Sequence, residues 1–261
     1  MSDSTKAPIQ PDLTIVIPAY KEAKRIGPTL EKLADFLHNY SPSVEVIVVD
    51  RGSSDDTQKV AKSYAKKFRW FSVLDIGSQT GKKSYKGEQV KQGMLAARGE
   101  YVMFMDADLA TPLKYLNTVE GLMKKKQAVG ICVRNLQSSH KGLRKLISSS
   151  GNFLVQLMIL PGISDTQCGF KVFSSEATKK IFTHQTLKGW GFDMEILAIA
   201  RQQGYQIEQF EVPDWQDVEE GSKVSSGSKF SAAKAALQTL PDVFRIKWGI
   251  IRGRYKKSPQ A

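Results

Sequence analysis

The chain has 261 residues, of which 41 % are hydrophobic, and it carries a formal net charge of +12 at pH 7. This hydrophobic fraction excludes global disorder, and the length suits one large α/β domain or a domain with a substantial appendage. The surplus of positive charge requires a negative partner, and nucleic acid, nucleotide phosphates or an anionic membrane surface would each satisfy it.

The first half of the chain alternates apolar runs with helical patterns. We expect strands over residues 13–17, 44–49, 71–76, 101–105 and 128–133. Helical patterns follow over 26–37, after a cap at Ser54 or Asp55, over 88–97 and from Pro112. Such alternation predicts a Rossmann-like, doubly wound and mostly parallel sheet. Ligands of these sheets bind at the carboxyl ends of the strands.

The second half is less regular. A segment rich in Ser, Lys and Arg at 135–150 precedes an apolar helix that ends at Leu160, and a further helix is expected over 192–202. A strand is expected over 205–212, followed by a C-terminal helical pattern that Pro241 interrupts.

Unusual polar residues follow the predicted strands, and Asp106-Ala107-Asp108 is the most informative group. An isolated Asp-x-Asp is a weak signal, because strand-ending turns use Asp just as readily. Two carboxylates at the carboxyl end of a buried strand can, however, hold a divalent cation that neutralises a diphosphate. The other polar residues expected at this edge are Tyr20, Glu22, Asp50 and Arg134.

Other signals concern location. Cys132 and Cys168 are too few for a disulfide scaffold and lack metal-binding spacing, so we expect a reducing cytosol and a packing role for Cys168. We see no signal peptide and no transmembrane helix, since the best apolar run, Phe153 to Leu160, is far shorter than the roughly 20 residues of a span. Basic and aromatic residues alternate after Pro241, which is typical of a segment on a bilayer interface, although a solvated basic tail has the same composition.

Seven segments together carry a family resemblance. They are TIVIPAYKEAKRI (14–26), VIVVDRGSSDDT (46–57), FMDADLATP (104–112), DTQCGFKVF (165–173), GFDME (191–195), EVP (211–213) and GSKV (221–224). With them, the chain resembles glycosyltransferase family 2, which has the GT-A fold, and within it the dolichyl-phosphate (polyprenyl-phosphate) β-glucosyltransferases. The resemblance covers roughly residues 12–225.

The resemblance implies a domain organisation. Residues 1–11 would form a flexible N-terminus, and 12–225 a GT-A domain with a nucleotide half (12–134) and an acceptor half (135–225). Residues 226–261 would form a C-terminal amphipathic helix with a basic tail. We expect this helix and the segment 143–160 to dock on a membrane, with an ordinary core helix as the alternative for 143–160.

The resemblance also implies an activity. It is the inverting transfer of a hexose, with glucose from UDP-glucose favoured, to a polyprenyl or dolichyl monophosphate at the cytoplasmic face of a membrane, with Mg²⁺ or Mn²⁺ as cofactor. A GDP-mannose-dependent polyprenyl-phosphate mannosyltransferase is the alternative donor class. Nucleic acid is not expected as a partner, because carboxylates at the strand ends would repel its phosphates.

Matching motifs assign roles to individual residues. Asp106 and Asp108 would bind metal, and together with Arg134 and Asp193 they form the expected catalytic group, in which Asp193 positions the sugar or the basic residues. The residues expected to bind the nucleotide sugar are Pro18, Ala19, Tyr20, Glu22, Asp50, Arg51, Ser53, Lys86, Asp106, Ala107 and Asp108. The residues expected to bind the acceptor phosphate are Arg134, Arg144, Gln167 and Lys223.

One departure from the family pattern concerns base recognition. Relatives usually have Asp where this chain has Arg51, and a guanidinium can only donate hydrogen bonds. Arg51 therefore cannot accept the N–H of uracil, and a catalytically weakened, membrane-associated relative is a further alternative.

Overall fold

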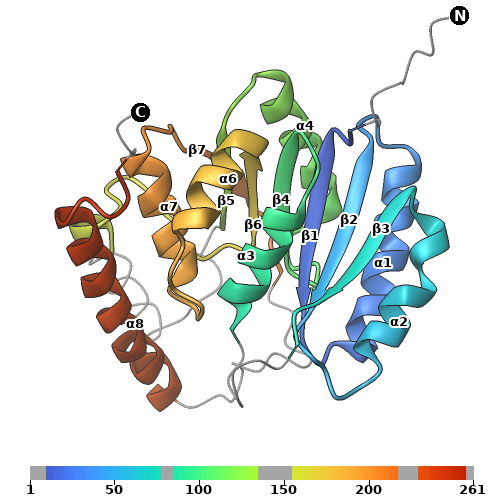
Figure 1. Cartoon of the computed structure of the whole chain (residues 1–261), viewed down its shortest axis with the longest axis horizontal. Helices are drawn as coiled ribbons and strands as arrows, with labels where there is room; N and C mark the ends of the chain where they lie inside the picture. The colour runs from blue at the N-terminus through green and yellow to red at the C-terminus, as the bar shows by residue number, and fades with distance from the viewer. Residues whose placement is uncertain (1–9, 78–84, 135–154, 217–228, 257–261) are drawn as a thin grey trace, which may run out of the picture.

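A computed structural model of the chain describes residues 10–77, 85–134, 155–216 and 229–256. Its centre is a seven-stranded sheet in the order β3-β2-β1-β4-β6-β5-β7 (Figure 1). The strands are β1 (Leu13–Ala19), β2 (Val44–Asp50), β3 (Trp70–Asp75), β4 (Tyr101–Met105), β5 (Val129–Arg134), β6 (Phe170–Ser174) and β7 (Glu208–Val212). Only β6 runs against its neighbours β4 and β5. The carboxyl ends of β1, β2, β4 and β5 therefore lie at one edge of the sheet.

Helices cover both faces of the sheet (Figure 1). They are α1 (Ala23–His38), α2 (Thr57–Ser63), α3 (Lys86–Ala96), α4 (Leu116–Lys124), α6 (Ser175–His184), α7 (Phe192–Gln202) and α8 (Lys229–Ile251), with short 3₁₀ turns at Ala65–Lys67 and Leu113–Tyr115. Because side chains alternate along a strand, Ile15 belongs to the core cluster on the side of α1, α2 and α4, while Val16 belongs to the cluster on the side of α3, α6 and α7. The outermost helix is α8, which lies against α7.

The strands and helices predicted for residues 12–134 are confirmed within a few residues, but the strand predicted over 13–17 does not end before Pro18. Pro18 lies inside β1, which continues to Ala19. The pairing of β1 with β4 stops at Val16, so Pro18 is paired only with β2. A proline is tolerated there because one side of the strand needs no N–H donor.

The later part of the chain differs more from the prediction. Strand β6 and helix α6 were not predicted, and β7 begins at Glu208 rather than at 205. Pro241 lies within α8 instead of interrupting it. Neither Ser54 nor Asp55 caps α2 directly, since α2 begins at Thr57, whose N–H donates to the Asp55 carboxylate over 3.2 Å.

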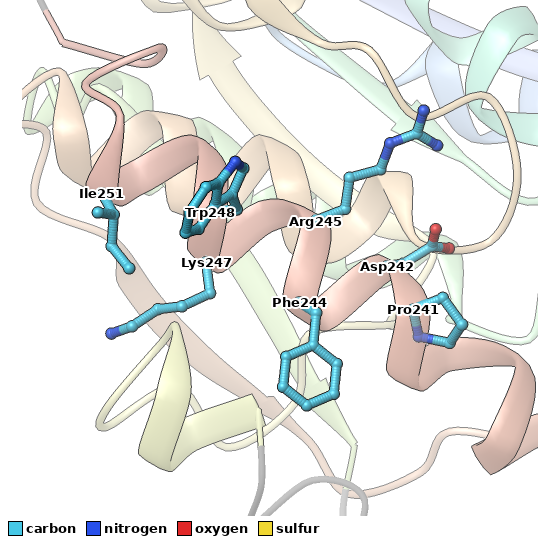
Figure 2. A pocket seen from close by; sticks show the side chains of 7 residues that line it. All are labelled: Pro241, Asp242, Phe244, Arg245, Lys247, Trp248 and Ile251. Carbon is cyan, nitrogen blue, oxygen red and sulfur yellow. The ribbon is translucent and has the colours of Figure 1, made fainter.

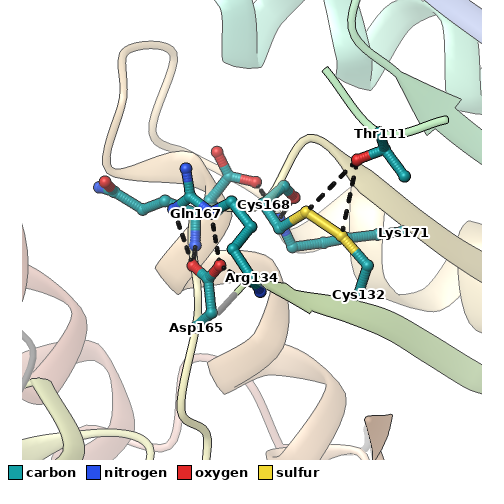
Figure 3. The surroundings of a disulfide bond; sticks show 8 residues. Thr111, Cys132, Arg134, Asp165, Gln167, Cys168 and Lys171 are labelled. Atoms are coloured by element: carbon teal, nitrogen blue, oxygen red, sulfur yellow. Dashed lines mark hydrogen bonds and ion pairs between the residues drawn. A yellow bond between two sulfur atoms is a disulfide. The ribbon is translucent and has the colours of Figure 1, made fainter. Parts of the chain in front are cut away.

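The cysteines give a further correction. Cys132 of β5 and Cys168 form a disulfide with their Cα atoms 6.1 Å apart, beside the Thr111 hydroxyl (Figure 3). Both cysteines are fully buried in the core, as the expected packing role of Cys168 requires, but the disulfide was not expected. The cysteines therefore give no argument for a reducing compartment. Among the helices that the structure describes, none combines the length and apolar character needed to span a bilayer.

Candidate active site

Lys86 and Asp106 meet at the carboxyl edge of the sheet. Lys86 is the first residue of α3, and Asp106 directly follows β4. The Lys86 Nζ lies 2.5 Å from Asp106 Oδ1, and the Lys86 side chain is only 15 % exposed. Burial opposes the ammonium charge, but Asp106 and Asp193 outweigh it and hold the pKa of Lys86 above its usual value. The site therefore presents a fixed positive charge at a helix N-terminus, where phosphates bind readily.

The backbone around Asp106 is held from the neighbouring strand. The Asp106 N–H donates to the Gly169 carbonyl over 3.1 Å. A Cβ at Gly169 would overlap the Asp106 carboxylate, so only glycine allows this close approach. The DTQCGF segment thus shapes the site directly.

Asp108 completes the carboxylate pair. Its Oδ1 accepts the Ala110 N–H over 3.0 Å, and burial followed by repulsion from Asp106 raises its pKa. A divalent cation would relieve this repulsion, and Mg²⁺ or Mn²⁺ prefers such oxygen ligands. Within the described ranges no group of three or more His, Cys, Asp or Glu residues could hold a metal ion. Two carboxylates still fit the usual Mg²⁺ arrangement, in which substrate phosphates complete the coordination.

Hydrogen bonds join the segments that directly follow β1 and β2. Asp50 is fully buried, and its carboxylate accepts from the Ser53 N–H and hydroxyl and from the Gln58 amide. The Ser53 hydroxyl in turn accepts the Lys21 N–H over 2.8 Å. Asp50 therefore shapes these segments, although it was expected close to the base or ribose.

Gln89 ties the two strand ends together. Its amide nitrogen donates to the carbonyls of Ala19 and Val49 over 2.7 and 2.8 Å. The sequence prediction missed Gln89, because nothing in a helical pattern shows that one of its polar side chains faces two strand ends.

Arg51 lies against the residue that precedes α3. Its guanidinium stacks on the Tyr85 ring at 4.8 Å, and Arg51 is only 5 % exposed. This contact joins the end of β2 to the start of the helix that carries Lys86. Arg51 thus has a packing role that its sequence position did not reveal.

A cleft of about 780 Å³ opens beside Asp108, between the β4 end and the first turns of α1. Glu22 and Arg25 line it and pair with each other at 3.4 Å. Ala107 also lines it, and its carbonyl accepts the Thr29 hydroxyl over 2.5 Å. Pro18 and Tyr20 are half-buried at the end of β1, and in the sequence they come just before Lys21 and Glu22, which line the cleft. The structure therefore brings most of the expected nucleotide-binding residues to one edge.

Arg134 ends β5 and is held by a partner that the sequence did not suggest. Its Nε donates to Asp165 Oδ2 over 2.6 Å, and a terminal nitrogen donates to Oδ1 over 3.0 Å (Figure 3). The Gln167 N–H also donates to Asp165, and the Arg134 guanidinium lies 5.1 Å from the Trp215 ring. Arg134 is therefore fixed in orientation, with 19 % of its side chain exposed.

We expect Asp165→Asn to lower the free energy of unfolding by about 3 kcal/mol at pH 7, because Arg134 loses a buried countercharge. Burial raises the pKa of Asp165, but the Arg134 bonds outweigh it and hold this pKa below its usual value. Such a group adds stability above the unfolded-state pKa of about 4, which is lost as the pH falls through the folded-state value. Urea unfolding from pH 7 to pH 3 should show the difference shrinking below about pH 4, whereas the exposed Asp35→Asn control should change little.

Asp193 lies in the first turn of α7 and is paired with a residue that the sequence prediction missed. Lys171 of β6 is fully buried, and its Nζ donates to Asp193 Oδ1 and to the Cys168 carbonyl, both over 2.5 Å. Burial lowers the pKa of Lys171 and raises that of Asp193. The one available signal was a lysine inside the apolar run Phe170–Phe173, which indicates a buried and paired amine.

Several predicted residues cannot be placed. Arg144 and Lys223, expected to bind the acceptor phosphate, lie outside the described residues, as does most of the predicted docking segment 143–160. The described part of the site therefore contains Lys86, Asp106, Asp108, Arg134 and Asp193 from the expected set.

Comparisons with known proteins point to one family. The model of glycosyl transferase family 2 matches residues 14–182. The chain is 32 % identical over 261 residues to the dolichyl-phosphate β-glucosyltransferase of Dictyostelium discoideum, covering 94 % of this chain and 76 % of that protein. It is 31 % identical over 267 residues to that of Saccharomyces cerevisiae, with the same coverage of 94 % and 76 %.

Solved structures share the fold at lower identity. The glucosyl-3-phosphoglycerate synthase of Mycobacterium tuberculosis in complex with UDP superposes with a TM-score of 0.63 and 15 % identity, covering 91 % of this chain and 80 % of that one. Its complex with Mn²⁺, UDP-glucose and phosphoglyceric acid gives a TM-score of 0.62 at 16 % identity, with the same coverage of 91 % and 80 %. At these identities the likeness concerns the fold alone.

Proposed function

The chain belongs to glycosyltransferase family 2 and has the GT-A fold, and we propose that it transfers glucose from UDP-glucose to a polyprenyl phosphate such as dolichyl phosphate. The observation that carries this proposal is the Lys86–Asp106 pair beside Asp108 at the carboxyl edge of the sheet. Its support in the sequence is the similarity to dolichyl-phosphate β-glucosyltransferases over most of the chain. The cytoplasmic face of a membrane remains the predicted location.

The chemistry requires no general base. A phosphate monoester has a second pKa of about 6, so the acceptor is mostly a dianion at neutral pH. One acceptor oxygen attacks the anomeric carbon, the bond from that carbon to the UDP oxygen breaks, and the configuration inverts. The enzyme must hold two anions together and stabilise the departing diphosphate. Lys86 is the described residue best placed for the diphosphate, because it is charged, partly exposed and at the start of α3.

Asp106 and Asp108 would hold a divalent metal ion, which, when bound, supplies positive charge to the diphosphate. Asp193 is too firmly paired with Lys171 to be a free base, so we assign it to positioning. Arg134, oriented by Asp165, would face the acceptor phosphate together with Gln167. Arg144 and Lys223 complete the proposed acceptor set.

The decisive experiment offers the purified chain Mn²⁺, a polyprenyl phosphate and radiolabelled UDP-glucose, UDP-galactose or GDP-mannose. We expect labelled lipid from UDP-glucose alone. Excess EDTA should abolish transfer, and added Mn²⁺ or Mg²⁺ should restore it. Transfer from GDP-mannose would instead support the mannosyltransferase alternative. No transfer from any donor would reject the proposed function.

Arg51→Asp tests whether the departure at this position weakens the enzyme. We expect no gain in kcat/KM for UDP-glucose, and a lower melting temperature, because the variant loses the Arg51–Tyr85 stacking and buries a carboxylate in its place. Steady-state kinetics with thermal melting measure both effects, with Arg51→Gln as the uncharged control. A gain of more than about tenfold would instead show that Arg51 impairs catalysis.

A further inference from the structure

Helix α8 has two apolar faces, although a surface helix needs only one. Val243 and Ile246 are fully buried on its inner face. Just beyond α8, the buried Tyr255 donates its hydroxyl to Glu195 of α7 over 2.9 Å, and its carbonyl accepts from Gln203 over 2.8 Å. The inner face thus already fixes α8 to the body of the protein.

The outer face is apolar and exposed. Phe244, Trp248 and Ile251 follow one another at helical spacing, and they are 59 %, 53 % and 64 % exposed. They line a groove of about 650 Å³ on the outside of the helix (Figure 2). We call these three residues the outer stripe. Large apolar side chains that are exposed in a row mark an interaction surface rather than ordinary surface variation.

Cations border the outer stripe on both sides. By helical periodicity, Lys247 lies along one side of it and Arg245 and Arg252 along the other, with the Arg252 guanidinium 4.6 Å from the Trp248 ring. The one carboxylate between residues 240 and 256 belongs to Asp242. A Cβ at Gly191 would overlap this carboxylate, so Asp242 lies against the start of α7. The charge around the stripe is therefore positive.

We propose that the outer stripe and its bordering cations bind an anionic membrane surface. Apolar side chains enter the headgroup region, tryptophan favours that depth, and each nearby cation adds attraction to anionic lipid. A second protein chain would bury the stripe equally well, but it would not account for cations on both sides. The proposal rests on the proposed function for its purpose, because the acceptor is a lipid.

Contacts connect this surface to the site. Asp242 of α8 touches Gly191, which lies two residues before Asp193. Trp190, the neighbour of Gly191, lies 5.6 Å from the Lys86 Nζ and is itself 59 % exposed. A membrane held by α8 would therefore lie close to the edge where a lipid phosphate must enter.

Vesicle flotation tests the proposal with the purified full chain and no sugar donor or polyprenyl phosphate. We expect the protein to bind vesicles of phosphatidylcholine with 30 % phosphatidylserine, and to bind vesicles of phosphatidylcholine alone at least about tenfold more weakly. High salt should abolish the binding to the anionic vesicles. Replacing all three stripe residues by Ser should weaken binding at least about tenfold, with Leu95→Ser as the exposed apolar control. Replacing Arg245, Lys247 and Arg252 by Gln should weaken it on the order of 100-fold, with Gln at Lys62, Lys66 and Lys125 as the control.

A second readout needs no multiple substitution. Tryptophan emission should shift to the blue and be quenched by brominated lipid in the unmodified protein, and Trp248→Phe should remove most of both effects. Equal binding of the stripe variant and the unmodified protein would overturn the proposal, as would a concentration-dependent dimer that this variant dissociates while no vesicle binds. Because the assay contains no substrates, vesicle binding without transfer would reject only the proposed function.

Discussion

Asp106→Asn should abolish nearly all transfer, lowering kcat/KM for UDP-glucose by at least about 10³-fold. The substitution removes one of the two carboxylates proposed to hold the metal and also removes the partner of Lys86. A loss of this size corresponds to about 4 kcal/mol of transition-state stabilisation, a reasonable value for a group that helps to stabilise the charge of the departing diphosphate. Initial rates with radiolabelled UDP-glucose at saturating Mn²⁺ measure it.

The control is a similar aspartate at the same edge of the sheet. Asp75 ends β3, is exposed, and accepts the Gly77 N–H over 2.9 Å. Asp75→Asn should leave kcat/KM within about threefold of the unmodified enzyme, since surface substitutions rarely have large effects. If Asp106→Asn keeps more than a tenth of the activity, Asp106 is not central to the reaction.

Lys86→Met should cause a comparable loss, and the double variant should be little worse than either single one. When two residues act as a unit, removing either one already removes most of their joint contribution, so the losses in kcat/KM are not additive. Additive losses would show that Lys86 and Asp106 contribute separately, against the contact observed between them.

The elements of residues 12–134 could be predicted well from the sequence because their signals are local. Val44–Val49 is an apolar run interrupted only by Glu45, typical of a strand that is covered on both faces, and the structure gives β2 there. The helical pattern over 88–97, which begins two residues after Lys86, and the strand end before Asp106 are local signals of the same kind. The parallel sheet then brings them together without further information.

What the sequence did not reveal depends on distant partners. Asp165 binds Arg134 across 31 positions, and Lys171 binds Asp193 across 22. Neither pair follows from a periodic pattern, because each depends on the reversed strand β6, which has only five residues. Pro241 was misjudged because a proline generally ends or kinks a helix, whereas α8 continues through it, and its later turns are packed on α7.

Lys171→Met should lower the free energy of unfolding by about 3 to 5 kcal/mol. The Asp193 carboxylate is almost completely buried, and without Lys171 it keeps its burial and loses its main countercharge. For a chain of this size the melting temperature should fall by about 10 °C. Urea unfolding with matched thermal melts measures the effect, and Lys180→Met, which breaks an exposed pair with Glu176 on α6, should change little.

The double variant Lys171→Met with Asp193→Asn distinguishes a lost charge pair from a lost packing volume. If an uncompensated buried carboxylate causes the instability, the double variant should be more stable than Lys171→Met alone, because its buried group is neutral. It should also transfer glucose poorly, since Asp193 no longer holds the charge that stabilises Lys86 beside Asp106. A double variant as unstable as the sum of the single ones would assign the effect to packing.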